Sequence, residues 1–534
     1  MRSKLIFLAV IVTLPALSQV VVSTQHNDNF RSGLNSKEKI LAPTNVSPKT
    51  FGKLFSYPVD GFVYAQPLYI PGVPIGGMNH NVIYIATEND SVYAFDADSN
   101  AGANANPLWH VNFTNPAAGV TPVIFWDVNS SDIVPYIGIT STPVIQVLTS
   151  TIYVIAKTAE VSGTTTNYVQ RLHALDLKTG AEKFGGPVVI APTYPGTDVP
   201  NDGNGNVIFD ALHQHNRPGL LLSGGVLYAA WASHGDQDPY HGWLVGFNAS
   251  TLQQVSVYNT TPNTIPGAAP SGRGGFWQGG SGLSADQTGS IYGVTGNGSF
   301  DGIANFGDSV LKFSSTLHVT DSFTPYDQDA ISANDVDLGS SGAMLMPPQS
   351  GPTPHLLITA SKNGSIYVIN RDAMGGYNPN GNQIVQYLPG ASGAEFGSLS
   401  VGPGFVYSWG ANDTLRAFPV NGGLLGAPIL GPAIAGYPGP HTSVSSNGAT
   451  NSIVWAIQTD QYVTGGPAAL LAFAGANIAV KLYDSGINLT RDNPGPAVKF
   501  SAPTVANGKV YVGTQNSVSV FGLLPLLNGQ TSPN

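Results

Sequence analysis

The stretch NVIYIATENDSVYAFDADS, Asn81 to Ser99, places two short apolar runs on either side of a polar turn and ends in a second turn. Apolar and polar residues alternate in much of both runs, which is typical of β-strands whose side chains point to opposite faces. Variants of this stretch return about every 50–70 residues along the chain. Repeats of this kind indicate stacked β-units, each too small to bury its own apolar face and therefore sharing a core with its neighbours.

The first unit contains four strand-like runs, AQPLYI, VIYIAT, SVYAF and LWHVNF, with Gly, Asn and Asp between them. Four antiparallel strands repeated around an axis form a β-propeller blade, and the units number eight. The last unit ends one strand short, whereas an extra run, FGKLFSYPV, precedes the first unit at Phe51 to Val59. We therefore predict an all-β, eight-bladed propeller whose ring is closed when this N-terminal strand pairs with the strand near Ser517 to Phe521.

The composition suits short strands and tight turns. Only 10% of the 534 residues are charged, while Gly and Pro number 64 and 40. Long helices need more Glu, Lys and Ala than such a chain supplies. The net charge of −10 argues against a nucleic-acid partner, because a phosphate backbone attracts a basic surface.

The N-terminus has the pattern of a signal peptide, with Arg2 and Lys4 before an apolar run and small residues after it. The run is too short to span a bilayer, and no later segment is apolar for long enough. We expect a signal peptide at 1–18, an N-terminal extension at 19–44, one propeller at 45–523 and a tail at 524–534. The chain is then secreted or periplasmic, without an integral membrane segment. Ten Asn-x-Ser/Thr sequons, close to the number expected by chance, weakly support a glycoprotein.

Three repeat segments, VYAFDA, LHALDLKTG and IYVINRD, resemble the repeat of quinoprotein propellers, the fold of PQQ-dependent alcohol dehydrogenases. The resemblance covers nearly all of the mature chain. It implies the eight-bladed fold strongly and the activity weakly, because the same fold hosts dehydrogenases and non-catalytic scaffolds.

Four further segments are similar to the family's cofactor site. In GGFWQGG, Trp277 falls where the family stacks a tryptophan on the quinone, and in TGNGS, Asn297 falls at a metal-ligand position. HGDQDPYHG offers Asp236 or Asp238 for the acidic metal ligand. NDVDLG places Asp335 where the catalytic base lies, with Asp337 two residues on as a further metal ligand, and SKNG places Lys362 at the quinone oxygen.

Chemistry supports these assignments, because an indole is a flat apolar partner for a quinone and calcium takes oxygen ligands. Each residue also has a structural interpretation. Trp277 is equally suited to packing between blades, Asn297 to a turn or to carrying a glycan, and Lys362 to a solvated turn. Asp335 and Asp337 are equally suited to capping turns.

The sequence departs from the family in several places. It has no cysteine, so the family's adjacent-cysteine pair is missing. The family's NRG motif, whose Arg binds the cofactor, corresponds to Ile139–Ser141, and no haem-attachment motif is present. Four histidines between His213 and His241 suggest a zinc site as a third hypothesis, and we expect them at the same end of the propeller as Trp277.

Two functions remain open from the sequence. The first is a secreted quinoprotein-like oxidoreductase that oxidises alcohol or sugar hydroxyls with PQQ and calcium and passes electrons to a separate acceptor. The second is a non-catalytic propeller that binds protein or glycan through its loops. Convergence of the candidate residues on one cavity favours the first, whereas scattered, solvent-facing side chains favour the second.

Overall fold

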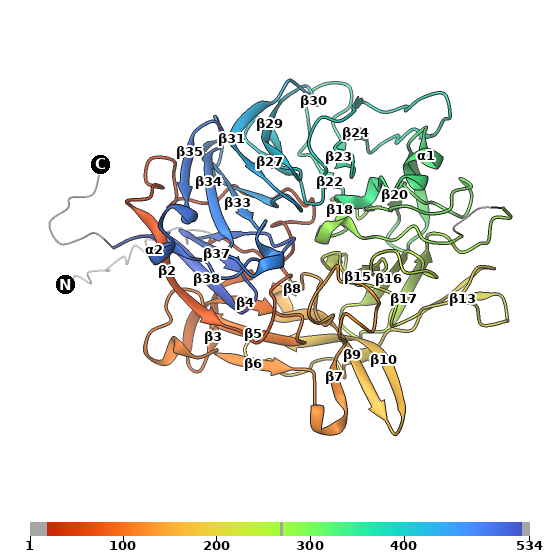
Figure 1. Cartoon of the computed structure of the whole chain (residues 1–534), viewed down its shortest axis with the longest axis horizontal. Coiled ribbons are helices and arrows are strands. Elements are labelled where there is room, and N and C mark those ends of the chain that lie inside the picture. The colour runs from red at the N-terminus through yellow and green to blue at the C-terminus, as the bar shows by residue number, and fades with distance from the viewer. Residues whose placement is uncertain (1–18, 268–270, 526–534) are drawn as a thin grey trace, which may run out of the picture.

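The computed structural model describes residues 19–267 and 271–525, so the expected signal peptide and residues 526–534 of the tail lie outside it. Eight small antiparallel sheets are arranged around a ring (Figure 1). The prediction of an eight-bladed, all-β propeller is confirmed. Among the described residues, no helix is both long and apolar enough to cross a membrane.

Each blade is built from four strands, and we number the blades from the first sequence unit. Blade 1 contains β3 (Leu68–Ile75), β4 (Met78–Ala86), β5 (Ser91–Asp96) and β6 (Trp109–Asn112), and blade 2 contains β8 (Val144–Gln146), β9 (Thr151–Ser162), β10 (Thr165–Asp176) and β11 (Val188–Val189). Blade 3 contains β14 (Leu221–Ser223), β15 (Val226–Trp231), β16 (Trp243–Asn248) and β17 (Gln254–Asn259), and blade 4 contains β18 (Ser284–Ala285), β19 (Ile291–Val294), β20 (Val310–Phe313) and β21 (Val319–Thr324).

Blade 5 contains β22 (Met344–Leu345), β23 (Leu356–Ala360), β24 (Ile366–Asn370) and β26 (Gln386–Leu388), and blade 6 contains β27 (Ser400–Gly402), β28 (Phe405–Ser408), β29 (Asp413–Asn421) and β31 (Ile429–Ala435). Blade 7 contains β32 (Thr442–Asn447), β33 (Thr450–Gln458), β34 (Ala469–Ala474) and β35 (Lys481–Asp484), and blade 8 contains β36 (Thr504–Ala506), β37 (Lys509–Gly513), β38 (Ser517–Leu523) and β2 (Phe51–Pro58). Further strands and two short α-helices lie outside these sets of four: β1 (Leu34–Asn35), β7 (Val120–Pro122), β12 (Thr193–Pro195), β13 (Asn206–Ile208), β25 (Gly376–Tyr377), β30 (Leu424–Leu425), α1 (Gln328–Ala333) and α2 (Leu489–Asp492).

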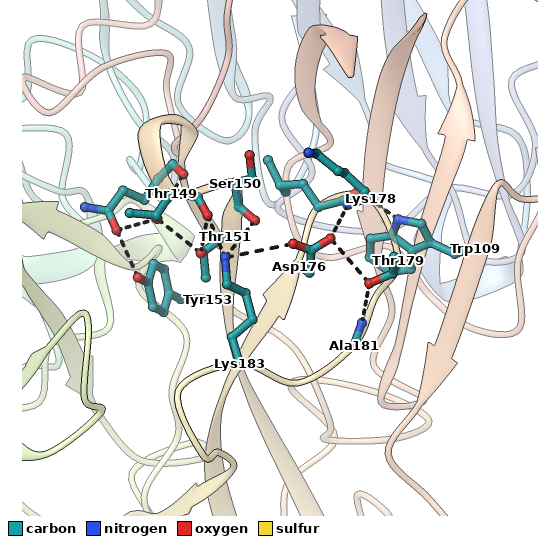
Figure 2. A network of polar contacts seen from close by, with 12 residues as sticks. Trp109, Thr149, Ser150, Thr151, Tyr153, Asp176, Lys178, Thr179, Ala181 and Lys183 are labelled. Atoms are coloured by element: carbon teal, nitrogen blue, oxygen red, sulfur yellow. Dashed lines mark hydrogen bonds and ion pairs between the residues drawn. The ribbon is translucent and has the colours of Figure 1, made fainter. Parts of the chain in front are cut away.

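The Asp-containing turn that follows the third strand of blade 2 packs against the preceding blade (Figure 2). After β10, the Asp176 carboxylate accepts hydrogen bonds from the backbone N–H of Lys178 and the hydroxyl of Thr179. The indole of Trp109, in β6 of the preceding blade, donates to the carbonyl of Leu177 at 2.8 Å. A β-carbon at Gly180 would lie 2.7 Å from the Trp109 ring, and the residue has a left-handed φ of +71°. The turn therefore ends in glycine because the neighbouring blade packs against it.

The ring closes as the sequence predicts. Strand β2 pairs antiparallel with β38, from Phe51 opposite Leu523 to Pro58 opposite Ser517, and Figure 1 shows the red N-terminal strand beside the blue C-terminal one. Closure pairs β38 on both sides, because β37 covers its other edge. A blade edge that would otherwise expose free backbone groups is thereby removed.

The N-terminal segment at 22–35, which we name the N-terminal belt, contacts the first strand or its approach in every blade. Neighbouring first strands contact one another around the ring, so they lie innermost. The belt meets the blades in order through hydrogen bonds that join Val22 to Tyr69, Ser23 to Ile145, Asn29 to Leu222 and Ala285, Phe30 to Leu345, Ser32 to Val401, Gly33 to Val444 and Asn35 to Val505. The buried Arg31 guanidinium donates to the carbonyls of Leu220, Leu283 and Gln25. The belt thus satisfies polar groups around the axis.

Two sets of loops meet at one end of the propeller. In an antiparallel four-stranded blade, the loop between the second and third strands lies at the same end as the connection that leads to the next blade. Blades 3 to 5 place the loops 232–242, 295–309 and 361–365 at this end, together with the connecting residues 260–267, 271–283 and 325–343. All of the candidate site residues therefore lie at one end, which we name the site face.

Candidate functional site

A cavity of about 330 Å³ opens at the site face. This volume lies at the lower end of the range for small-molecule pockets. Of the seven candidate residues, five line it: Asp236, Trp277, Asp335, Asp337 and Lys362. The residues come from the loops of blades 3 to 5, which are far apart in sequence but adjacent in the ring.

Four of the candidates contact one another directly. The Lys362 ammonium donates to Asp335 Oδ1 at 2.7 Å and to Asp337 Oδ2 at 3.1 Å. The side-chain amide of Asn297 donates to Asp335 Oδ1 at 2.8 Å, and its backbone N–H donates to Asp337 Oδ1 at 2.8 Å. Asn297 is buried and its amide oxygen has no hydrogen-bond partner. Three loops thus assemble two carboxylates, an ammonium and an unsatisfied carbonyl oxygen.

The Gly-Asn-Gly sequence around Asn297 explains how the backbone fits there. A β-carbon at Gly296 would lie 2.5 Å from Asp337 Oδ1, and one at Gly298 would lie 2.4 Å from the Gly274 nitrogen. Glycine on both sides therefore lets the Asn297 backbone approach the loop at 334–340 and the Trp277 loop together. Because the side chain of Asn297 is only 2% exposed, it points into the protein and not outward from a surface sequon.

The structure separates the two aspartates between which the sequence could not choose. Asp236 lines the cavity and accepts a hydrogen bond from the Tyr240 hydroxyl at 2.7 Å. Asp238 does not line the cavity and forms a two-point ion pair with Arg273, whose Nε and Nη2 lie 3.0 and 2.6 Å from its carboxylate oxygens. Of the two, Asp236 is placed to meet a ligand.

Trp277 both packs and lines the cavity. Its indole meets the rings of Phe396 and Phe500 edge-on, with ring centroids 6.1 and 5.4 Å apart. These aromatic residues come from connections between different blades, so Trp277 belongs to a cluster near the axis. Aromatic pairs of this geometry hold a ring in a defined orientation. The indole is therefore a fixed part of the cavity wall.

Left-handed backbone conformations are concentrated at this site. Outside glycine such conformations are uncommon, and they cluster where surrounding structure holds a side chain in a functional position. Five of the non-glycine residues with positive φ lie on the loops around the cavity: Asp236, Arg273, Gln278, Asp308 and Asp335. Three of the five are aspartates, which adopt this conformation more readily than most residues.

The charged groups affect one another's proton affinity. Burial raises the pKa of Asp236, as do the nearby charges of Asp337 and Asp335, while Tyr240 and Arg273 oppose the rise. Burial and the charge of Asp337 raise the pKa of Asp308 well above its usual range. Burial alone would lower the pKa of Lys362, but Asp337 and Asp335 outweigh it and raise the pKa. Lys362 therefore carries its charge at neutral pH.

The histidine group does not form a zinc site. His215 stacks on His234 with ring centroids 4.2 Å apart, whereas His213 bonds to Asp210 and His241 to Thr261 and the Val199 carbonyl. His241 forms a β-bridge with Arg273, which stands four residues before Trp277 in the sequence. The histidine group therefore lies at the site face, as the sequence predicts. Within residues 19–267 and 271–525, no three His, Cys, Asp or Glu side chains lie close enough to hold a metal ion.

Several residues at the site carried no sequence signal strong enough to select them. Tyr240 and Arg273 hold Asp236 and Asp238, and Tyr437, from the connection between blades 6 and 7, lines the cavity. The buried Arg217 donates to the carbonyl of Thr140 at 2.6 Å, so a guanidinium lies beside residues 139–141. The proximity of Arg273 to Trp277 in sequence was the one available clue.

A buried carboxyl group next to the cavity should make stability depend on pH. Glu395 is 1% exposed, and burial raises its pKa to about 8 despite a hydrogen bond from Ser408 at 2.6 Å. Because the folded protein holds this proton more tightly than the unfolded chain, stability is full at low pH and falls as pH rises through about 4.5 to 8.

We expect Glu395→Gln to remove this dependence. The wild type should lose up to about 1.4 kcal/mol per pH unit relative to the variant across that window. Thermal melting of both proteins at pH 5, 6, 7 and 8 measures the difference. Parallel pH profiles would show that Glu395 ionises freely in the folded state.

Comparison with known proteins identifies the class of fold. No protein-family model and no curated protein sequence matches the chain. Solved structures do match: a quinohemoprotein alcohol dehydrogenase from Pseudomonas putida HK5 has a TM-score of 0.61 and 15% identity over 96% of this chain and 82% of its own. The quinohemoprotein alcohol dehydrogenase of Comamonas testosteroni has a TM-score of 0.59 and 14% identity with the same coverage. A europium-containing methanol dehydrogenase has a TM-score of 0.58 and 13% identity over 94% of this chain and 98% of its own.

The protein therefore has the eight-bladed propeller fold of the quinoprotein alcohol dehydrogenases. At 13–15% identity, the likeness extends to the fold and not to the chemistry of the site.

Proposed function

We propose that this chain is a secreted quinoprotein-like oxidoreductase that oxidises alcohol or sugar hydroxyls with PQQ and calcium. The observation that supports the proposal most is that Asn297 contacts Asp335 and Asp337, which Lys362 also contacts. Asp335, Asp337 and Lys362 line the same cavity as Trp277. Turn residues have no physical reason to converge in this way. Export rests on the pattern of residues 1–18, which lie outside the described structure.

The residues present fit an oxygen-ligated cation. Asn297 has a buried amide oxygen without a partner, and burying such a group unsatisfied costs free energy. Calcium takes amide and carboxylate oxygens, and Asp335, Asp337 and Asp236 face the same cavity. We assign Asn297 and Asp337 as metal ligands, with Asp236 as the third, and leave Asp238 to its ion pair with Arg273.

The residues also fit a planar quinone. Trp277 would hold its ring, Lys362 would contact its oxygen, and Arg217 is a cation near the segment where the family carries an Arg. When bound, the quinone would accept the substrate's hydrogen with its electron pair. Because the described chain carries no haem-attachment motif, electrons would leave to a separate acceptor.

We assign Asp335 as the base, and its exposure and hydrogen bonds support this assignment. Its carboxylate is 67% exposed at the cavity mouth, where a hydroxyl can reach it. Lys362 and Asn297 both donate to its Oδ1, which leaves Oδ2 available to accept a proton. Asp337, which is less exposed, accepts from Asn297 and Lys362 and keeps both in place.

Cofactor loading tests the proposal. Protein mixed with PQQ and calcium chloride and then passed through a desalting column should retain the quinone absorbance and reduce a dye when alcohols are added. Trp277→Ala should lose the retained absorbance, whereas Trp126→Ala, at a residue that is 73% exposed, should keep it.

Failure to retain PQQ would instead favour the non-catalytic scaffold. That alternative has its own observation, since Lys362 already pairs with Asp335 and Asp337, and Arg273 with Asp238.

A further inference from the structure

A second cavity, of about 290 Å³, is lined by residues of blade 2 and of the chain that leads into it from blade 1. It shares no lining residue with the cavity at the site face. One wall is a face of the β9–β10 hairpin, which extends from the rim of the ring beside β7 (Figure 1). The volume lies near the lower end of the range for small-molecule pockets, so it suits a single ring better than a long chain.

Strand alternation places the polar side chains of this wall together. Thr158 and Glu160 are two residues apart on β9, and Arg171 and His173 are two residues apart on β10. Residues with this spacing point to the same face of a strand. All four line the cavity. The side chains of Arg171 and Glu160 are 28% and 27% exposed, so a ligand can reach them.

The charged groups of the wall are already paired with one another. Arg171 forms a two-point ion pair with Glu160, whose Oε1 also accepts a hydrogen bond from the Thr158 hydroxyl at 3.0 Å. His173 bonds through Nδ1 to Glu182, which stands outside the cavity lining. A charged ligand would have to break one of these pairs, so the wall favours a neutral ligand.

The same groups keep hydrogen-bonding capacity for such a ligand. A guanidinium has five N–H groups, and the bonds to Glu160 and Thr158 engage at most three of those on Arg171. Carboxylate oxygens have further lone pairs. Among the described residues, none forms a hydrogen bond with His173 Nε2. A hydroxyl group donates to a carboxylate or an imidazole and accepts from a guanidinium, so it can join the wall without displacing any partner.

Apolar side chains complete the cavity. The ring of Phe113 stacks on the imidazole of His173, with centroids 3.7 Å apart and an angle of 25° between the planes, and so fixes the orientation of the imidazole. Val120 and Pro187 also line the cavity. A ligand that fits has C–H groups beside its hydroxyls, as a sugar ring has.

We infer that this cavity binds a neutral sugar ring through two neighbouring hydroxyl groups. One hydroxyl meets the ion pair of Arg171 with Glu160, the next meets His173 Nε2, and the C–H groups contact Phe113 and Val120. The inference goes beyond the proposed function and does not depend on it, because the site is separate and only binds.

Saturation-transfer NMR on the purified full chain, without PQQ or calcium, tests the site. The probes are the methyl pyranosides of glucose, mannose and galactose, and at least one should show transfer and a saturable titration. Cyclohexanol, a ring with a single hydroxyl, should show none. The uronate of the bound sugar, which adds a negative charge, should bind several-fold more weakly. A uronate that binds more tightly would overturn the assignment of a neutral ligand.

Variants locate the binding. His173→Phe keeps an aromatic ring against Phe113 but has no Nε2, and it should weaken binding about tenfold or more. Arg171→Met provides an independent variant if the first fails to fold. His355→Phe is the matched control, because His355 also pairs with a carboxylate, that of Asp372, but lines neither cavity, and its affinity should be unchanged.

The outcomes separate this inference from the proposed function. Transfer to none of the three sugars, or binding that survives both variants, overturns the sugar site. Loss of binding in Asp335→Asn but not in His173→Phe would move the sugar to the cavity at the site face and also overturn it. Sugar binding that depends on His173, without any PQQ retention, supports this site and the non-catalytic scaffold.

Discussion

Replacement of Asp335 by Asn should abolish dye reduction by the PQQ- and calcium-loaded protein while leaving its fold intact. An amide cannot accept the hydroxyl proton, and loss of a general base costs about 10²–10⁴-fold in rate. The backbone is not disturbed, because Asn tolerates the left-handed φ of 55° that Asp335 adopts. Lys362 keeps Asp337 as its partner, and the side chain at 335 is mostly exposed.

The matched control is Asp329→Asn, an exposed aspartate of α1 six residues away. It should retain the full rate and the same melting temperature. An Asp335→Asn protein that reduces the dye at the wild-type rate would place the base elsewhere. An Asp335→Asn protein that melts well below the wild type would contradict the structural independence of the side chain.

Loss of the closing strand should destabilise the propeller more than any single surface change. Phe51 in β2 is fully buried and packs on Trp455, Tyr483 and Phe521, with ring centroids 5.4, 4.9 and 6.4 Å away. Truncation of such a ring costs about 3–5 kcal/mol, so Phe51→Ala should lower the melting temperature clearly. Deletion of residues 46–60 should do so more severely and promote association, because the edge of β38 is then exposed.

Phe184→Ala provides the control, since the ring of Phe184 is 36% exposed and its loss should change the melting temperature little. If Phe51→Ala and Phe184→Ala melt alike, the closing strand does not hold the ring together. The point variant keeps the prediction testable where the deletion fails to fold.

The fold was predictable because its signal is local and repeated. Each blade repeats the alternation of its strands, and in blades 1, 2 and 5 an Asp-containing turn follows the third strand. Asp96 and Asp176 both accept backbone hydrogen bonds within two or three residues of themselves. Ring closure also followed from the sequence, because a last unit with three strands leaves one edge to be paired. Local chemistry of this kind does not depend on distant residues, so it can be interpreted without a structure.

The N-terminal belt was not predicted, for the opposite reason. Its hydrogen bonds join residues separated by up to 470 positions, as between Asn35 and Val505. The segment at 22–35 has no strong alternation of its own, and its partners are backbone N–H and carbonyl groups of inner strands that any sequence would offer. Only the assembled ring shows that Arg31 is buried and that its donors are satisfied.

For the site, the sequence by itself determined which residue types stand on which loops: an Asn between two glycines, two aspartates spaced by one residue, and a Lys before an Asn-Gly turn. Which of them meet was decided by the tertiary structure alone. Asp236 and Asp238 are two residues apart and indistinguishable as letters, yet the Tyr240 hydroxyl holds the first at the cavity and Arg273 draws the second away. The cavity wall likewise unites Trp277, Phe396 and Tyr437 from separate connections between blades. The physical reason is that side-chain direction depends on backbone angles and on long-range partners, which a local pattern does not encode.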